Sequence, residues 1–200
     1  LPEDFSGVIQ DSASSATLAA MLVMRERALD GAGNRRGLAG GPAPRVYCSD
    51  QVHSSVDRAA RISGVGQDNL VKLAADPETG ALAPEALDAA IRADRAAGHA
   101  PAGVVACVGG TSVGAADDVR AAVEVAREHG LYVHVDAAWA GAAMICPEFR
   151  ALWDGAEAAD SIVVNPHKWL GAQFDCAAHL VRDPEALVRT LSLQPEYLRT

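Results

Sequence analysis

Lysine chemistry has two candidates in this chain, because Lys72 and Lys168 are the only lysines among its 17 basic residues. Lys168 lies in the segment Asn165–Trp169, which directly follows the apolar run Ser161–Val164. A primary amine held there could form a Schiff base with a carbonyl compound. Most lysines are merely solvated, and we expect the charge of Lys72, within the strand-like run Asn69–Leu73, to reach solvent. Lys168 is therefore the candidate for covalent chemistry.

An acidic residue ends another apolar run. Asp136 follows the strand-like segment Leu131–Val135 and precedes the small residues Ala137 and Ala138. Aspartates in such places are often helix caps or turn residues. A catalytic role would need a cationic partner in a buried setting. Asp136 is therefore a candidate for stabilising a positive charge.

Small polar groups also gather at expected helix starts and turns. Asp11–Thr17 is rich in serine, and the N–H groups and hydroxyls of a helix N-terminus can bind phosphate, although such serines are more often simple caps. His53, within Ser49–Ser55, and Thr111, in a glycine turn, are each more often cap or surface residues than catalysts. With the lysine and the aspartate, these residues meet the needs of a pyridoxal phosphate site: a phosphate cradle, an acid for the pyridine nitrogen, a Schiff-base lysine and a group that covers the ring.

The rest of the chain alternates short apolar runs with helical patterns, which predicts an α/β fold. Strands joined by helices favour a mostly parallel sheet with helices on both faces, whose functional sites lie beyond the carboxyl ends of the strands. Candidate residues accordingly follow Cys48, Val108, Val135 and Val164. Strands are predicted at Arg45–Cys48, Asn69–Leu73, Gly103–Val108, Leu131–Val135, Ser161–Val164 and Ala177–Val181; helices at Ala16–Leu29 (capped by Ser12 or Ser14), Val56–Ile62, Pro84–Ala97, Asp118–His129 and Pro184–Leu191; and a surface loop at Gly31–Pro44.

Composition excludes several classes of function. A net charge of −9 and a pI near 5.0, without a basic block, argue against nucleic acid or an anionic membrane as a partner. Apolar stretches too short to cross a bilayer, and a Leu1–Gln10 segment unlike a signal peptide, predict one soluble cytoplasmic domain. The four cysteines form no CxxC pair, so we expect reduced, mostly buried thiols and no metal site. Neither GxGxxG nor a P-loop occurs.

The order and spacing of five segments resemble the pyridoxal-phosphate-dependent group II decarboxylases, and most of all the aromatic L-amino acid decarboxylases. The resemblance covers nearly all of the chain, and Asn165–Trp169 is its most specific segment. It implies that residues 1–200 form the cofactor-binding large domain of fold type I, which is aspartate aminotransferase-like. The resembling segments are Gly7–Ser14, Ser49–Ser55, His134–Gly141, Ile145–Arg150 and Asn165–Trp169.

The resemblance also implies a role for each candidate residue. Lys168 would form the internal aldimine, and Asp136 would pair with the pyridine N–H. His53 would stack on one face of the ring, with the Ala138 methyl group on the other. The remaining cofactor contacts would come from Ser12, Ala13, Ser14, Asn165 and His167 at the phosphate and from Thr111 near the ring.

Four residues depart from the family pattern. Asp11 and Ser15 stand where animal members tend to have glycine and glutamate, and Gly110 stands where those members carry a hydroxyl residue. Trp139 replaces a tyrosine. We expect the extra carboxylate of Asp11 to weaken phosphate binding unless it points away or caps the helix.

The expected reaction is decarboxylation of an aromatic L-amino acid to its amine and CO2, through an external aldimine and a quinonoid. Three alternatives remain: a glutamate-type decarboxylase, an aldehyde synthase, which His53 disfavours, and a catalytically silent scaffold. By resemblance the family also has an N-terminal segment, a catalytic loop and a C-terminal small domain that this chain lacks; Leu191–Thr200 resembles the stretch before that loop. A homodimer with sites at or near the subunit interface is expected.

Overall fold

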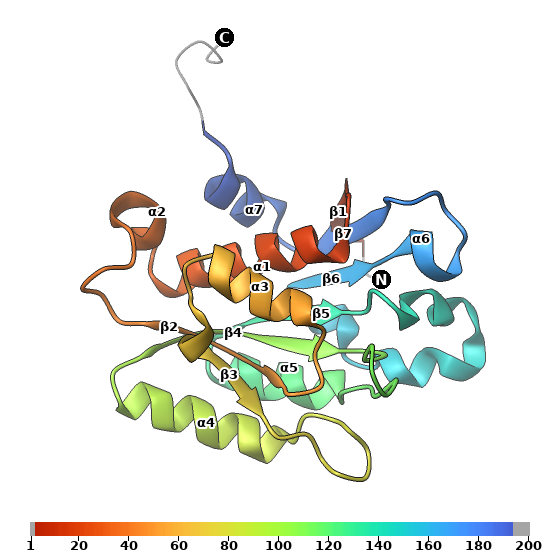
Figure 1. Ribbon diagram of the computed structural model, residues 1–200, viewed down its shortest axis with the longest axis horizontal. Coiled ribbons are helices and arrows are strands. Elements are labelled where there is room, and N and C mark those ends of the chain that lie inside the picture. The colour runs from red at the N-terminus through yellow and green to blue at the C-terminus, as the bar shows by residue number, and fades with distance from the viewer. Residues whose placement is uncertain (1–2, 194–200) are drawn as a thin grey trace.

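A seven-stranded sheet forms the centre of the computed structural model, which describes residues 3–193 (Figure 1). The strand order is β1-β7-β6-β5-β4-β2-β3. In this order the neighbouring strands β6, β5, β4, β2 and β3 pair in parallel. Strand β7 pairs antiparallel with both β6 and β1. The prediction of a mostly parallel sheet is therefore confirmed. The strands are β1 (Ser6–Gln10), β2 (Pro44–Ser49), β3 (Leu70–Leu73), β4 (Ala100–Cys107), β5 (Tyr132–Asp136), β6 (Ser161–Val164) and β7 (Ala177–Val181).

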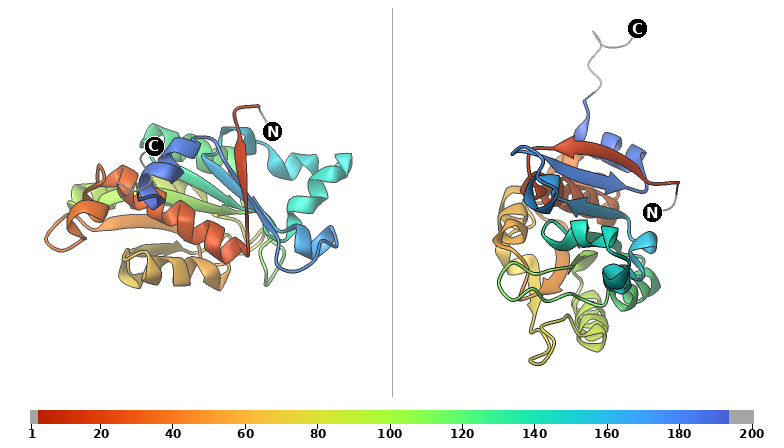
Figure 2. Two further views of the ribbon diagram at one scale, coloured as in Figure 1. Left: turned by 90° about the horizontal axis from the view of Figure 1, so that it is seen from above. Right: turned by 90° about the vertical axis from the view of Figure 1, so that its right-hand side faces the viewer.

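Helices cover both faces of this sheet (Figures 1 and 2). Helices α1 and α3 pack together on one face, and α4 and α5 pack together on the other. The helices are α1 (Ala13–Ala28), α2 (Ala32–Arg36), α3 (Ser54–Ile62), α4 (Pro84–Ala96), α5 (Val119–Glu128), α6 (Pro166–Trp169) and α7 (Pro184–Leu191). Short 3₁₀ segments occupy Gln67–Asn69, Ala140–Ile145, Pro147–Trp153 and Ala156–Ala158.

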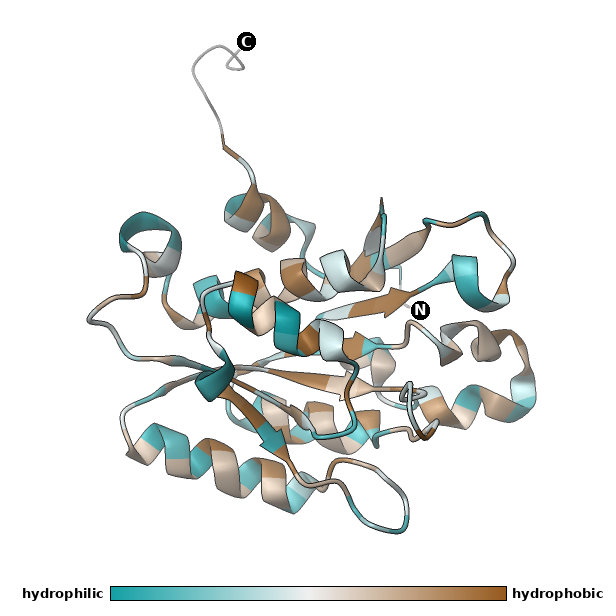
Figure 3. Cartoon of the chain, viewed as in Figure 1, coloured by the Kyte–Doolittle hydropathy of each residue, from teal (hydrophilic) through white to brown (hydrophobic). Residues whose placement is uncertain are grey.

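Alternation along the strands divides the core into two layers. In β5, Tyr132 packs in the layer beneath α1 and α3, whereas Val133 and Val135 pack in the layer with α5. Since side chains alternate along a strand, His134 and Asp136 share the face of Tyr132. Figure 3 shows the two-sided pattern of α3 and α4, where hydrophilic and hydrophobic residues alternate. The sequence of β5 thus directs Asp136 to the α1 side at the carboxyl end of the strand.

Three elements differ from the sequence prediction. β1 was not predicted; its residues are largely exposed, and it is held by pairing with β7 at the sheet edge. Helix α2 lies inside the predicted loop, and α6 is a single turn directly after β6. Helix α1 begins at Ala13, with Ser12 as its cap through a 3.3 Å hydrogen bond from Ser15 N–H. Each missed element is short and takes its position from tertiary contacts.

Membrane spans, metal sites and cysteines are described for residues 3–193. No helix in this range is long and apolar enough to cross a membrane. No cluster of histidine, cysteine and acidic side chains with the arrangement of a metal site occurs there. All four cysteines are free; Cys48 and Cys107 are buried, whereas Cys146 and Cys176 are partly exposed. Residues 194–200, which include most of the segment predicted to precede a catalytic loop, lie outside the described range.

Candidate active site

The carboxyl ends of the parallel strands bring the predicted residues to one edge of the sheet. Cys107 pairs with Asp136, and Asp136 pairs with Val163, so β4, β5 and β6 end side by side. Ala13 of the first turn of α1 packs in a small apolar cluster with Ala138 and Val163. The start of α1 therefore meets the ends of β5 and β6.

Asp136 is a buried carboxyl group with few partners. It is only 5% exposed, and its Oδ1 accepts a hydrogen bond from Ala138 N–H at 3.1 Å. Burial raises the pKa of Asp136, while the Ala138 N–H and the nearby His53 and Lys168 oppose that rise. A buried carboxylate in this position would be stabilised by a cation. The functional interpretation of Asp136 required a buried cationic partner; the structure shows the burial, and within residues 3–193 no cationic side chain lies within 4.0 Å of this carboxyl group.

The two lysines lie in different surroundings. Lys168 is an exposed residue of α6, whose backbone N–H donates to Asn165 O at 3.0 Å. Within residues 3–193 its amine has no acidic partner within 4.0 Å, whereas Lys72 Nζ lies 2.8 Å from a carboxylate oxygen of Asp57. The prediction that Lys72 reaches the surface is confirmed, and the amine of Lys168 has no acidic partner in that range, while its charge acts to lower the pKa of Asp136.

The first turn of α1 presents unpaired backbone donors. Ser12 N–H donates to Asp11 Oδ1 at 2.9 Å, and Ser15 N–H donates to Ser12 Oγ. The N–H groups of Ala13 and Ser14 make no hydrogen bond within residues 3–193. Asp11 also accepts from the Ser15 hydroxyl, which lowers the pKa of Asp11. Asp11 thus folds back onto the helix start, so its charge stays beside the predicted phosphate cradle.

Two histidines of this edge accept hydrogen bonds from backbone N–H groups. His53 is the N-cap residue of α3, and its Nδ1 accepts from Ser55 N–H at 3.1 Å. His167, in α6, accepts from Cys176 N–H at 2.8 Å through Nδ1. Sequence reasoning named both histidines but missed Ser55 and Cys176. The spacing of His53 and Ser55 at a helix start could have indicated the first contact, because a cap bonds to the residue two or three positions on.

The remaining predicted residues are at the same edge with fewer contacts. Asn165 is 5% exposed, and its buried Oδ1 has no hydrogen-bond partner within the described range. Thr111 is exposed in a turn closed by hydrogen bonds from Gly109 and Gly110 N–H to Ala115 O, and it makes no hydrogen bond there. The structure therefore places Thr111 near the site without attaching it to another residue.

Two tryptophans join the segments that carry Ala138 and Lys168. The rings of Trp139 and Trp169 meet edge to face, with centroids 4.8 Å apart, and each residue is nearly half exposed. Trp139 also packs close to Gly109, where a Cβ atom would lie 2.9 Å from Trp139 Cε3. The turn after β4 needs glycine at this position because its φ is +83° and a Cβ atom would lie 2.5 Å from Ala140 Cβ as well as close to Trp139.

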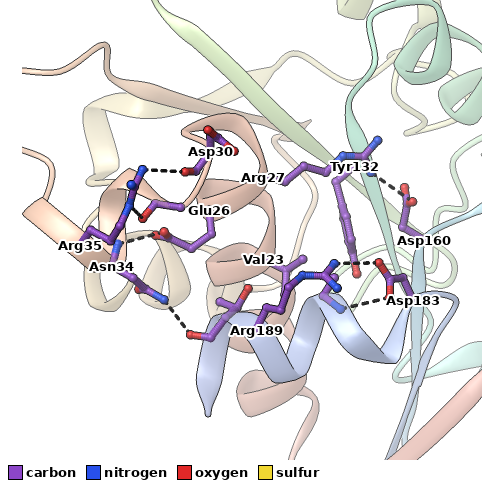
Figure 4. Close-up of a pocket in the computed structure, with 13 residues that line it drawn as sticks. Val23, Glu26, Arg27, Asp30, Asn34, Arg35, Tyr132, Asp160, Asp183 and Arg189 are labelled. Carbon is purple, nitrogen blue, oxygen red and sulfur yellow. Dashed lines mark hydrogen bonds and ion pairs between the residues drawn. The ribbon is translucent and has the colours of Figure 1, made fainter. Parts of the chain in front are cut away.

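A separate cavity of about 750 Å³ lies at the opposite edge of the sheet (Figure 4). It is lined by the end of α1, by α2 and α7, and by Tyr132 at the start of β5. Its charged side chains pair with one another, as in the ion pairs Arg27–Asp160 (3.4 Å) and Arg189–Asp183 (3.1 Å). None of the predicted site residues lines this cavity, so we assign the chemistry to the carboxyl edge.

The sheet and its carboxyl-edge lysine and aspartate define the class of the fold, which is that of fold-type-I pyridoxal phosphate enzymes. Residues 2–200 match the pyridoxal-dependent decarboxylase conserved domain, and the chain belongs to that family. The sequence prediction of the family and of the fold class is thereby confirmed.

Curated relatives and solved structures agree with this assignment. The chain is 41% identical to a phenylacetaldehyde synthase of Arabidopsis thaliana and 40% identical to a tryptophan decarboxylase of Camptotheca acuminata; each match covers 100% of this chain and 41% of the relative. A crystal structure of Oryza sativa TDC with PLP and tryptamine superposes with a TM-score of 0.93 at 41% identity, covering 100% of this chain and 42% of that one. The chain thus spans about two fifths of the length of these relatives.

Proposed function

We propose that this chain is the cofactor-binding large domain of a longer enzyme that decarboxylates an aromatic L-amino acid to its amine and CO2. The observation that carries the proposal is that Lys168, whose amine has no acidic partner within residues 3–193, follows β6 at the same edge of the sheet where the buried carboxyl group of Asp136 ends the neighbouring strand β5. Relatives named tryptophan decarboxylase and tyrosine decarboxylase support the aromatic substrate.

The residues present fit pyridoxal phosphate. Asp136 is buried with one hydrogen bond, which leaves room for the N–H of a pyridine ring. The unpartnered Oδ1 of Asn165 and the free N–H groups of Ala13 and Ser14 are polar atoms that a bound group would satisfy. A helix N-terminus suits the dianionic phosphate because its donors and its dipole both favour negative charge.

Each residue has a distinct part in this proposal. The Lys168 amine would hold the cofactor covalently, and Asp136 would hold the proton on the pyridine nitrogen. The phosphate would be held by Ser12, Ala13, Ser14, Asn165 and His167, and the ring by His53, Ala138 and Thr111. When bound, the cofactor supplies an electron sink for the pair of electrons that the departing CO2 leaves behind.

The electrostatics of Asp136 serve this chemistry. Its burial lowers the local dielectric, so an ion pair between its carboxylate and a ring N–H would be stronger than in water. That pairing would keep the ring nitrogen protonated while negative charge develops on the substrate carbon. The protein thus contributes orientation and a fixed counter-charge.

An aldehyde synthase is the second candidate, because the chain is 41% identical to a phenylacetaldehyde synthase. Supplying the full-length protein separately with tryptophan, tyrosine, phenylalanine and glutamate and analysing the products separates the candidates. We expect the amine and CO2 in equal amounts. Aldehyde with hydrogen peroxide would support the synthase, activity on glutamate alone would support a glutamate-type enzyme, and cofactor binding without any product would support a scaffold.

A homodimer in the cytoplasm is the proposed working form. Large apolar side chains are exposed around the candidate site, and burial of such a surface favours pairing of two copies. These residues, here called the apolar rim, are Trp139, Ile145, Phe149, Leu152, Trp169, Leu170 and Phe174. They belong to the 3₁₀ segments and α6 region at one end of the molecule (Figure 2). The four free cysteines support a reducing compartment.

A further inference from the structure

The helical turn α6, which carries Lys168, is too short to hold its own position. It has four residues, Pro166–Trp169, and none of them is buried. Forming one helical turn costs more backbone entropy than its hydrogen bond returns, so contacts with other segments must stabilise it. Its backbone hydrogen bonds include Lys168 N–H to Asn165 O at 3.0 Å and His167 N–H to Cys176 O at 3.4 Å, neither of which reaches β5. The orientation of Lys168 therefore depends on what α6 packs against.

Two contacts fasten α6 to the segment directly after β5. Before its first residue, Asn165 N–H donates to Ala138 O at 3.3 Å. At its last residue, the ring of Trp169 meets the ring of Trp139 edge to face, with centroids 4.8 Å apart and ring planes at 86°. The two contacts use adjacent residues of the β5 segment and lie on either side of Lys168 in the sequence. Lys168 is therefore held between a backbone hydrogen bond and an aromatic contact.

Trp139 is also packed against the turn after β4. A Cβ atom at Gly109 would lie 2.9 Å from Trp139 Cε3, so the aromatic ring occupies the space beside this glycine. Strands β4, β5 and β6 are neighbours in the sheet, and Trp139 thus contacts the segments that follow the strands on both sides of its own. One side chain joins the three segments that carry Thr111, Ala138 and Lys168.

The two tryptophan rings can fix α6 although both reach the surface. Trp139 is 43% exposed and Trp169 is 48% exposed, so about half of each side chain is in contact with the protein. An edge-to-face pair is stabilised by the electrostatics of the ring edge and ring face as well as by the area that it buries. A tryptophan has only two side-chain torsions, so holding it costs little conformational entropy.

We propose that Trp139 is a positioning residue for Lys168: its contact with Trp169 holds α6 so that the Lys168 amine is presented at the edge where β5 ends with Asp136. The role of that amine in binding the cofactor rests on the proposed function. An amine that bonds to a carbonyl carbon must be held at a fixed distance and direction, so a small rotation of α6 would slow the reaction. Recognition of the substrate would change little. Loss of the Trp139 ring should therefore lower kcat more than it changes KM.

Hydrogen exchange of the full-length protein without cofactor tests the positioning role directly. Trp139→Ala should raise the exchange rate of the peptide that spans residues 165–172 roughly tenfold, as for the loss of one aromatic contact. Trp139→Phe keeps a ring and should restore most of the protection. Phe149→Ala is the matched control, because Phe149 is a 48% exposed aromatic residue of the same apolar rim and has no aromatic partner in the described range. Equal exchange of this peptide in Trp139→Ala and Phe149→Ala would refute the proposal.

Steady-state kinetics of the cofactor-loaded full-length enzyme provide the second readout. We expect kcat of Trp139→Ala to fall roughly 10- to 100-fold while KM changes less than about threefold, and Trp139→Phe to recover most of kcat. A raised KM with unchanged kcat would overturn the positioning role. If the wild-type protein makes no amine, the proposed function alone fails, because the exchange experiment needs no turnover and still decides the role of Trp139.

Discussion

Lys168 and Lys72 can be distinguished by covalent trapping, because their amines have different partners. Lys72 is engaged with Asp57, whereas Lys168 has no acidic partner in the described range. We expect borohydride reduction of the cofactor-loaded full-length protein to leave a pyridoxyl group on Lys168, as peptide mapping would show. Lys168→Arg should abolish labelling and lower turnover by several orders of magnitude. Lys72→Arg keeps the ion pair and should label like the wild type; an adduct on Lys72 would contradict the assignment.

Asp136→Asn should lower turnover far more than cofactor content. The phosphate contacts hold the cofactor, while Asp136 acts on the ring nitrogen, so we expect turnover to fall on the order of 10²- to 10³-fold with nearly full occupancy. Bound pyridoxal phosphate and the decarboxylation rate are measured together. Asp117→Asn is the matched control: Asp117 is also buried but accepts from the Leu82 and Cys107 N–H groups, so its loss should affect stability. Equally small effects of Asp136→Asn on both quantities would mark Asp136 as a structural cap.

Asp11→Asn should tighten cofactor binding. Asp11 is exposed and hydrogen-bonded to Ser12 and Ser15, and its pKa is lowered, so its charge is present at neutral pH beside the α1 N-terminus. Removal of this charge should reduce the dissociation constant of pyridoxal phosphate roughly twofold to fivefold. Asp30→Asn, just beyond the other end of α1, removes the same charge at a distance. An equal gain in both variants would show that only net charge matters.

Sequence reasoning named candidate site residues but not the contacts that hold them. Lys168, Asp136 and His53 were named because each follows a predicted strand and has an unusual side chain for that place. The contacts of Cys176 with His167 and of Ser55 with His53 use backbone N–H groups. Every residue type except proline has a backbone N–H donor, so the identity of Cys176 or Ser55 does not indicate that its N–H bonds to a histidine.

At the scale of elements, the histidines of β5 and β7 predict a loss of stability in acid. The buried rings of His134 and His179 meet edge to face, with centroids 5.8 Å apart. Burial lowers the pKa of His179 to about 4 and that of His134 in the same direction. Below the ordinary histidine pKa near 6.5 the unfolded chain therefore binds protons that the folded chain does not, and stability falls as the pH drops from 6.5 toward 4.

His179 alone should account for about 3 kcal/mol of this loss. The test is the urea midpoint of the full-length protein at pH 7, 5.5 and 4.5. His179→Met should flatten the decline between pH 6.5 and 4. The control variant is His99→Gln. His99 directly precedes β4 and contacts Arg45, and its replacement should leave the decline of stability with falling pH unchanged. An unchanged decline in His179→Met would contradict the prediction.

The elements that sequence predicted best are those with a local signal. The cap of α1, the proline at the start of α4 and the apolar runs of β4 and β5 are all visible in the sequence. β1 lacks such a signal, because its five residues are mostly exposed and its partner is β7. The direction of β7 could not be predicted either, since an isolated strand pattern does not specify whether its neighbour is parallel.

At the scale of the whole molecule, the apolar rim predicts self-association. We expect the full-length protein to sediment as a dimer at micromolar concentration. Phe149→Glu places a charge on the rim, where Phe149 is 48% exposed, and should shift the protein toward monomers with loss of activity. Ile62→Glu, at a 69% exposed position on α3, is the matched control and should remain dimeric. A wild-type monomer whose specific activity does not change on dilution would contradict the dimer.

The pairing of β1 with β7 has a consequence for biosynthesis. Gln10 lies 169 residues before its contact His179, and in the described structure β1 pairs with no other strand. At ordinary rates of translation the ribosome needs roughly 10 to 30 s to make the intervening chain. During that interval the β1 segment has no strand to join, although α1 directly after it can already form. The edge of the sheet must therefore close late, and nascent chains released before β7 expose an unpaired strand to aggregation or to chaperones.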